Sequence, residues 1–262
     1  MEACTYPAAL ARRYDRDYAA MGRSALDVGF YVGLARAARG PVLEMACGTG
    51  RVLLPMARAL AEEGAAGAHV TGVDPSPEMR AQLVAKLGRE PEAVRRLVSV
   101  HEGRFHRIPV RGPFALVCSP FRAFQHVHAV EEQRAAVAAM AGVLAPGGTL
   151  AFDVFDFDPK LARREGALDC EYDEGGRHIE RRSTTRYDPA AGVVQFEMRW
   201  FADGQPTGEH VEAPMRVVSH DELVDLVAGA GLRLEAIFGD FDRSPRQPGT
   251  TRDLIVVATR PA

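Results

Sequence analysis

Short apolar runs alternate with amphipathic helical patterns along residues 41–155, and this alternation predicts the class of fold. The predicted strands lie at 41–46, 69–73, 97–101, 114–119 and 149–155. Strands that are apolar on both faces are typical of a parallel sheet covered by helices on either side. We therefore expect an α/β fold with a doubly wound, mostly parallel sheet.

The pattern changes after about residue 160 to alternating apolar and polar positions. Val194, Phe196, Met198 and Trp200 alternate with polar residues, as in a half-buried antiparallel strand. Strands are expected at 178–187, 193–202 and 210–218, which together form an antiparallel β-meander. The predicted organisation is a helical segment at 1–40, an α/β domain at 41–164 and 219–262, and an inserted antiparallel sheet at 165–218.

Net charge and apolar content narrow the function classes. The chain has 262 residues and a net charge of −3, without the basic surface that binding to nucleic acid or an anionic membrane needs. No apolar run approaches the roughly 18 residues of a membrane span, and the charged N-terminal segment does not resemble a signal peptide. The scattered cysteines form no zinc or disulfide pattern, and they are Cys4, Cys47, Cys118 and Cys170. A cytoplasmic protein is therefore expected.

A glycine loop follows the first predicted strand and precedes a helix, an arrangement that binds nucleotides or their analogues. Its residues are Gly48, Thr49 and Gly50. A dinucleotide loop needs a third small residue, and Leu53 stands at that position; a P-loop needs a Gly-Lys-Ser/Thr sequence, which does not follow. The loop therefore departs from both phosphate-binding forms.

Asp74 ends the second predicted strand and would face this loop across the crevice of a doubly wound sheet. A carboxylate at that place can accept hydrogen bonds from both hydroxyl groups of a ribose. The alternative is an N-cap for the following helix, and the two roles are compatible.

Three segments together resemble the motifs of class I methyltransferases that depend on S-adenosylmethionine (SAM). They are Glu44–Gly50 at the glycine loop, Val73–Met79 after the second strand, and Leu144–Gly148 before the fifth. The resemblance covers nearly the whole chain and implies a Rossmann-like fold, SAM as cofactor and S-adenosylhomocysteine (SAH) as product. The residues that it places at the cofactor are Tyr14, Glu44, Ala46, Cys47, Gly48, Gly50, Asp74, Pro75, Met79, Arg104, Phe105, Ser119 and Phe121.

Two of these positions leave alternatives open. Glu44 would orient the amino end of SAM, or it would cap loop amides as a structural carboxylate. Arg104 stands where the family usually has an acid that binds the adenine amino group. Either Glu102 or a backbone carbonyl would then contact the adenine edge, or the ring would stack on Phe105. Arg104 is itself a candidate cofactor contact, with a solvated surface side chain as the alternative.

The segment after the fourth predicted strand resembles that of bacterial small-molecule methyltransferases. It has the single Pro120 where enzymes that methylate DNA or glutamine have two prolines. His126 is the candidate catalytic residue, as a base or an acceptor-binding group, because histidine titrates near neutral pH. The alternative is a histidine that is hydrogen-bonded at a loop–helix junction.

Further candidates lie around the expected acceptor pocket. Arg122, Tyr31 and Trp200 are candidates for binding the acceptor, with surface coverage or aromatic packing as alternatives. The resemblance implies that 1–40 folds over the cofactor as a lid, where Tyr14 would contact the sulfonium by a cation–π interaction. The inserted sheet would roof the acceptor pocket or form the contact of a homodimer.

The acids in the run 153–158, after the fifth predicted strand, suggest a metal site. Metal-binding O-methyltransferases also need an acid after strand four, where this chain has Ser119, so we expect no metal. We expect these acids to face solvent or to cap the next turn.

The predicted function is methyl transfer from SAM to nitrogen or oxygen of a small-molecule acceptor. The alternatives are a protein or RNA methyltransferase, a nicotinamide oxidoreductase, and a SAM-binding module without catalysis.

Overall fold

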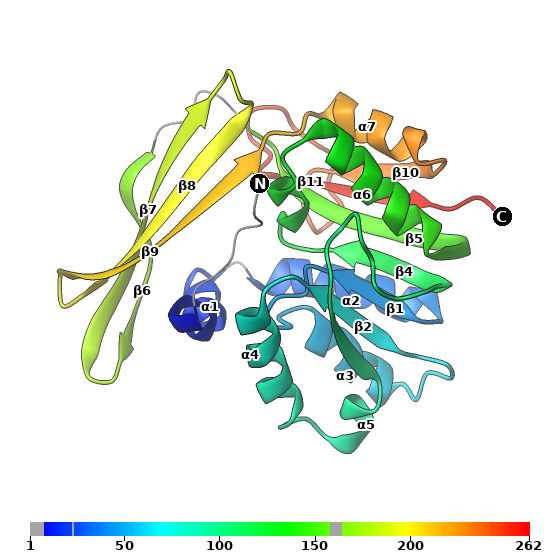
Figure 1. The fold of residues 1–262 in the computed structure, drawn as a ribbon, viewed down its shortest axis with the longest axis horizontal. Helices are drawn as coiled ribbons and strands as arrows, with labels where there is room; N and C mark the ends of the chain where they lie inside the picture. Colours follow the sequence, from blue (N-terminus) through cyan, green and yellow to red (C-terminus); the bar gives the residue numbers. More distant parts are fainter. Residues whose placement is uncertain (1–7, 23, 158–163) are drawn as a thin grey trace.

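The computed structural model describes residues 8–22, 24–157 and 164–262, so Cys4 and Asp158 lie outside the described residues. Seven strands form the larger sheet: β1 (Val42–Met45), β2 (Val70–Asp74), β3 (Val98–Glu102), β4 (Phe114–Ser119), β5 (Leu144–Phe155), β10 (Arg233–Phe238) and β11 (Asp253–Thr259). Their order in space is β10-β11-β5-β4-β1-β2-β3 (Figure 1). Neighbouring strands from β5 to β3 are parallel, and β11 runs antiparallel to both of its neighbours. The predicted Rossmann-like, mostly parallel sheet is confirmed.

Helices cover both faces of this sheet. The described helices are α1 (Ala8–Ala20), α2 (Ser24–Ala38), α3 (Leu53–Glu62), α4 (Pro77–Leu87), the short α5 (Glu92–Arg95), the 3-10 turn η1 (Ala123–His126), α6 (Val130–Gly142) and α7 (His220–Gly229). Helices α6 and α7 pack on one face, and α2, α3 and α4 pack on the other. Among the described residues, no helix is long and apolar enough to cross a membrane.

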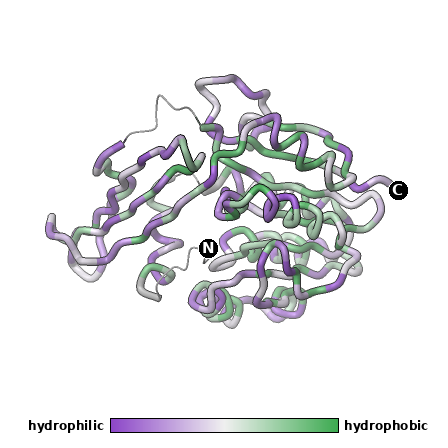
Figure 2. Tube along the Cα trace, turned by 45° about the horizontal axis from the view of Figure 1, so that its top comes forward, coloured by the Kyte–Doolittle hydropathy of each residue, from purple (hydrophilic) through white to green (hydrophobic). Residues whose placement is uncertain are grey.

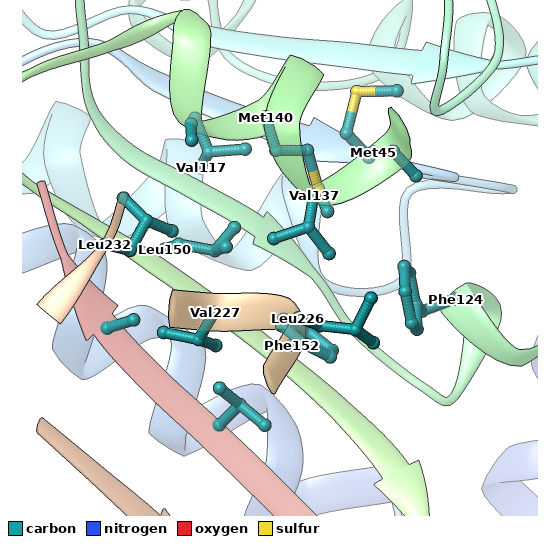
Figure 3. Close-up of a cluster of buried hydrophobic side chains, with 14 of the residues drawn as sticks. Met45, Val117, Phe124, Val137, Met140, Leu150, Phe152, Leu226, Val227 and Leu232 are labelled. Carbon is teal, nitrogen blue, oxygen red and sulfur yellow. The ribbon is translucent and has the colours of Figure 1, made fainter. Parts of the chain in front are cut away.

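Two hydrophobic layers hold the helices to the sheet because successive strand residues point to opposite faces. Leu150 packs with Met140 of α6 and Leu226 of α7 in one layer (Figure 3), whereas Ala151 packs with Tyr31 and the α3 side chains in the other. Full burial of a leucine side chain contributes roughly 2 kcal/mol. These layers fix the carboxyl ends of the strands, where the candidate site lies.

The inserted sheet has four antiparallel strands in sequence order: β6 (Arg164–Glu174), β7 (Arg177–Asp188), β8 (Val193–Ala202) and β9 (Gln205–Arg216). Strands β7 to β9 match the predicted meander, but β6 was not predicted. It is an edge strand in which only Cys170 is buried, so it lacks a periodic apolar face. The inserted sheet is also more hydrophilic along its trace than the central strands of the larger sheet (Figure 2).

The two N-terminal helices have different places in the fold. Helix α2 packs against α3 and β4, and its Tyr31 is fully buried, so α2 belongs to the α/β core rather than to a lid. Helix α1 lies between the inserted sheet and α4 (Figure 1). Leu10 on α1 packs with Ile179 and Trp200 of the inserted sheet. Of the two described N-terminal helices, α1 connects to the inserted sheet across the site, whereas α2 contributes Leu26 and Asp27 near its start to the cavity lining.

Candidate active site

A cavity of about 850 Å³ lies between the carboxyl ends of the parallel strands and the inserted sheet. The loops after β1, β2 and β4 line one side, and β7 to β9 line the other. Helix α1 and the β10–β11 connection complete the wall. The volume falls within the range of small-molecule sites, and the position is the usual ligand crevice of doubly wound sheets.

Most of the residues proposed from the sequence line this cavity. Those that do are Tyr14, Glu44, Ala46, Cys47, Gly48, Asp74, Pro75, Met79, Arg104, Phe105, Phe121, Arg122 and His126. The lining does not include Gly50, Ser119, Tyr31 or Trp200. For these four residues, direct contact with a ligand has no support from the geometry.

The glycine loop has two glycines with different tasks. Gly48 has a φ of +53°, and a Cβ added there would meet no atom within 4 Å, so the cavity side of this residue is open. Gly50 has a φ of +80°, and an added Cβ would lie 2.3 Å from Cδ1 of Leu83. Gly50 therefore allows close packing of the loop on α4, and its contact with the cofactor stays a prediction.

Asp74 is 6 % exposed and lines the cavity at the end of β2. Its Oδ2 accepts a hydrogen bond from Gly48 N (2.8 Å), and its Oδ1 accepts one from Ser76 N (2.8 Å). Burial raises the pKa of this carboxyl, against these two hydrogen bonds. The helix N-cap is Ser76, whose Oγ accepts from Met79 N (3.2 Å). Each oxygen of Asp74 thus keeps lone-pair capacity for a ligand hydroxyl.

Glu44 supplies a buried acceptor that lacks a donor. The residue is 2 % exposed, and among the described residues its Oε2 has no hydrogen-bond partner. Burial raises the pKa of Glu44 well above its ordinary value, and nearby Arg51 opposes this rise. A buried, unsatisfied carboxylate oxygen is costly without a partner. The ammonium group of the methionine half of SAM is a donor that fits this position.

Arg51 follows the glycine loop directly and was not proposed from the sequence. Its guanidinium donates from Nη1 to Oδ1 of Asp27 (3.0 Å), and it lies 4.5 Å from the ring centroid of Phe121. Both Arg51 and Asp27 line the cavity. Its position next to Gly50 is the signal that could have found it.

Gly103, Arg104 and Phe105 follow β3 and line the cavity where the sequence predicts the adenine end of the cofactor site. Glu102 is exposed and pairs with Arg80 (2.9 Å), and the cavity lining does not include it. Recognition of adenine by Glu102, one of the alternatives from the sequence, therefore has no support. Stacking of adenine on Phe105 remains a candidate, because the Phe105 side chain lines the cavity.

The loop after β4 contains two successive residues in the left-handed region, Phe121 (φ 63°) and Arg122 (φ 61°). This conformation costs roughly 1–2 kcal/mol for each non-glycine residue. The carboxylate of Asp153 accepts a hydrogen bond from each of their backbone N–H groups, both at 2.8 Å. Tyr31 Oη donates to the same carboxylate at 2.6 Å.

Asp153 is therefore an internal anchor at 1 % exposure, which corrects the expectation that acids at this strand end face solvent or cap the next turn. Burial, assisted by the negative charge of Asp253, raises the pKa of Asp153 to about 7. The side chain of Arg122 donates from Nε to Asp253 (2.6 Å), so its charge is already compensated. This pairing does not favour Arg122 as the receptor for an anionic acceptor.

Three aromatic rings meet in the middle of the cavity wall. The ring of Tyr18 lies 4.6 Å from that of Tyr14 and 4.6 Å from that of Phe121, measured between centroids. Burial raises the pKa of Tyr14 well above its ordinary value, so its hydroxyl stays protonated. The spacing of four positions between Tyr14 and Tyr18 puts both rings on one face of α1.

His126 lies on η1 and lines the cavity. Its Nδ1 is 3.2 Å from the carbonyl oxygen of Pro214, which can only accept, so Nδ1 carries the proton. Burial lowers the pKa of His126 to about 4, and the imidazole is neutral at physiological pH. Its Nε2 is consequently an acceptor. His128 donates from Nε2 to the same carbonyl (2.9 Å).

Trp200 and Tyr31 act away from the cavity. Trp200 Nε1 donates to Asp17 on α1 (3.0 Å), and Tyr172 Oη donates to the other oxygen of Asp17 (2.7 Å). Arg181 lies beside the same carboxylate at 3.7 Å. This buried group ties α1 to the inserted sheet, and Tyr31 holds Asp153 as described above.

The inner face of the inserted sheet adds both apolar and polar lining residues. They are Arg181, Ser183, Thr185, Phe196, Met198, Ala213 and Met215. In the part of the chain that the structure describes, no three His, Cys, Asp or Glu side chains are grouped to hold a metal ion.

The sequence of the chain was compared with models of protein families and with proteins of curated function. A model of a methyltransferase domain matches residues 42–148. No protein of curated function matches the chain in sequence.

Solved structures match over nearly the whole chain. One is the SAM-bound amino pentose methyltransferase CalS10 of Micromonospora echinaspora, involved in calicheamicin biosynthesis (25 % identity, 99 % of both chains, TM-score 0.72). Another is the methyltransferase CcbJ of Streptomyces caelestis (24 % identity, 91 % of this chain and 90 % of that one, TM-score 0.72). The sugar N-methyltransferase KedS8 of a Streptoalloteichus species is 22 % identical over 95 % of this chain and 93 % of that one, with a TM-score of 0.72. Residues 42–148 therefore form a methyltransferase domain, and the chain as a whole has the fold of these SAM-dependent methyltransferases.

Proposed function

We propose that the protein acts in the cytoplasm and transfers the methyl group of SAM to a nitrogen or oxygen of a small-molecule acceptor. The observation that carries this proposal is the single cavity shared by the glycine loop and the inner face of the inserted sheet. A methyl donor on the loop and an acceptor under the sheet would meet in this shared cavity. Structural similarity to sugar and amino pentose methyltransferases supports an acceptor of this size.

The chain holds SAM by three kinds of contact in this proposal. Glu44 accepts from the ammonium group, Asp74 accepts from the two ribose hydroxyls, and Phe105 stacks on the adenine. Each residue lines the cavity, and the unpartnered Oε2 of Glu44 is the strongest sign that a cationic ligand belongs there.

Paired charges around the acceptor half favour an amine or hydroxyl over a carboxylate. The guanidinium groups of Arg51, Arg122 and Arg181 each lie within 4 Å of a carboxylate oxygen, from Asp27, Asp253 and Asp169 respectively. An anionic acceptor would have to compete with these partners. An amine acceptor carries no such cost, and the structurally similar KedS8 is a sugar N-methyltransferase.

The chemical step is an in-line displacement in which SAM supplies the methyl group from its sulfonium. The S–C bond breaks as the bond to the acceptor atom forms, and the proton of the acceptor is released. His126 accepts a hydrogen bond from the acceptor at Nε2, which aims the acceptor lone pair at the methyl carbon. With a pKa of about 4, His126 passes the proton on to solvent rather than retaining it. Tyr14, Tyr18 and Phe121 exclude water around the sulfonium.

A screen for SAH release tests the proposal. The purified chain would be incubated with SAM and with panels of amino sugars, other amines, phenols and carboxylic acids. We expect release with an amine or hydroxyl acceptor and none with simple carboxylates. Calorimetry with SAM, SAH and NAD comes first; binding of NAD without binding of SAM would refute the proposal.

A further inference from the structure

We infer that Asp153 is a positioning residue for methyl transfer: its carboxylate fixes the Phe121–Arg122 turn, which carries part of the aromatic wall of the site. The inference deepens the proposed function and rests on it. It concerns how the cavity wall around the sulfonium is given its shape, and it assigns a positioning task to an acid in the cavity lining.

The contacts define this task. Each oxygen of the carboxylate accepts from one of two successive backbone N–H groups, those of Phe121 and Arg122. The β4–β5 register pairs Ser119 with Phe152, so Asp153 lies beside the point where the chain leaves β4. Tyr31 reaches from α2 and holds the carboxylate from behind. Three elements of the core thus converge on a single turn.

The turn needs such a holder because both of its residues are bulky and left-handed. If the two amides lost their common acceptor, the peptide units would relax toward ordinary backbone angles. The Phe121 ring, which packs edge-on against Tyr18 at 4.6 Å, would then leave its place in the aromatic group. The side chain of Arg122 anchors the far end of the turn on Asp253.

Fold stability does not explain a carboxylate at this position. Burial and the neighbouring Asp253 raise the pKa of Asp153, although Tyr31, Arg122 and the Phe121 amide oppose the rise. A neutral side chain of the same shape would avoid the desolvation cost. A carboxylate, however, gives each of the two amides an acceptor oxygen of its own, both at 2.8 Å. The choice of residue therefore serves the turn at a cost to the fold.

The test is Asp153→Asn, which keeps the shape but replaces one acceptor oxygen by an NH₂ group facing an N–H group. Calorimetry would give the dissociation constants of SAM and SAH, and thermal unfolding at pH 8 would report the fold. We expect SAH affinity to stay within about twofold, while SAM affinity falls about five- to tenfold as the aromatic contact with the sulfonium is lost. The unfolding midpoint should be equal to that of the wild type or higher.

Two further variants serve as a matched control and as a smaller change at the same carboxylate. Asp156→Asn makes the same change at the end of the same strand, where the carboxylate pairs with Arg246 at 2.7 and 2.9 Å, and should leave the SAM-to-SAH affinity ratio unchanged. Tyr31→Phe removes one of the three hydrogen bonds to Asp153 and should shift the ratio by less than Asp153→Asn does.

The inference is overturned if Asp153→Asn leaves the ratio unchanged, or if it weakens both ligands equally together with a lower unfolding midpoint. That second result would mark Asp153 as a purely structural anchor. If the wild type binds neither SAM nor SAH, the proposed function fails first, which is a different and recognisable outcome.

Discussion

The cofactor half of the cavity is walled largely by backbone turns at the ends of β1 and β2, whereas the acceptor half is walled by side chains from separate segments. Gly48 and Asp74 lie in two short motifs and are joined by one hydrogen bond. Arg122, His126 and Met198 come from the loop after β4, η1 and β8, and the inserted sheet lies on the opposite side of the cavity from the strand ends. The first half is thus specified locally, and the second depends on how distant elements dock.

Because of this difference, we expect the cofactor half to keep its geometry when substitutions adapt the acceptor half to another ligand. A turn that binds through N–H groups and one carboxylate tolerates little variation. A wall of side chains on an inserted sheet can be altered residue by residue without disturbing the parallel sheet beneath. The following predictions test whether the two halves respond as separately as their construction suggests.

Asp74→Ala should have the largest effect and should act on the cofactor half alone. The change removes the acceptors for both ribose hydroxyls and for the N–H groups of Gly48 and Ser76. We expect SAM affinity to fall about a hundredfold or more in calorimetry. Glu102→Ala is the matched control on the neighbouring strand and should change the affinity less than about twofold. An equal loss in both variants would reverse our assignment of the adenine end.

His126→Ala should act on the acceptor half alone. Turnover is expected to fall about 10- to 100-fold, because the acceptor loses the group that orients it. SAM affinity should not change. The control is His128→Ala, which removes the other histidine on the Pro214 carbonyl but does not alter the lining of the cavity. If the turnover of His126→Ala equals that of the wild type, His126 has no role in the mechanism.

The pKa of His126 adds a condition on pH. Because this pKa is lowered to about 4, the imidazole is neutral and competent above that pH and is lost as an acceptor only below it. Between pH 8 and pH 6, the titration of His126 should therefore not lower the turnover of the wild type. The pH profiles of the wild type and of His126→Ala should have the same shape in this range.

The titration of Asp153 should make the free energy of unfolding depend on pH. Its folded pKa of about 7 lies above its unfolded value, so the folded state holds this proton more tightly. The resulting stability is present at low pH and is lost as the pH rises through 7, an effect on the order of 1–3 kcal/mol. The charged and titratable groups that face it are Tyr31 from α2, Arg122 from the loop and Asp253 from β11.

We therefore expect the unfolding midpoint of the wild type to fall between pH 5.5 and pH 8 by more than that of Asp153→Asn. Glu44 and Asp74 also have raised pKa values, and the difference between the two proteins cancels their contribution. Parallel pH curves for the two proteins would show that Asp153 stays ionised throughout this range.

The sequence predicted the cofactor half better than the acceptor half for a physical reason. The existence of β1, β2 and β4 and the place of Asp74 at the end of β2 follow from apolar runs and a glycine loop, all within short stretches of chain. The roles of Gly50 and Asp153 could not be predicted in this way. Gly50 faces Leu83 on another helix, and Asp153 binds a turn about 30 residues earlier in the chain.

The inserted sheet shows the same limit from another side. Strand β6 has no continuous apolar face, because its position at the edge of the sheet leaves most of its residues exposed. Trp200 was proposed as an acceptor contact because an aromatic residue on a roof would suit that task. Its indole instead points to Asp17 on α1, a partner 183 positions away that no local pattern reveals.

Trp200→Phe should have the smallest effect and tests whether the tie between α1 and the inserted sheet is separable from acceptor binding. The change removes one hydrogen bond to the buried Asp17, while Tyr172 and Arg181 remain beside the carboxylate. One such bond contributes about 1 kcal/mol, so the unfolding midpoint should fall by about 2–4 °C. The KM for the acceptor should rise less than about threefold. A much larger rise in KM at an unchanged midpoint would mean that Trp200 contacts the acceptor itself, and that the roof moves toward the cavity when the site is filled.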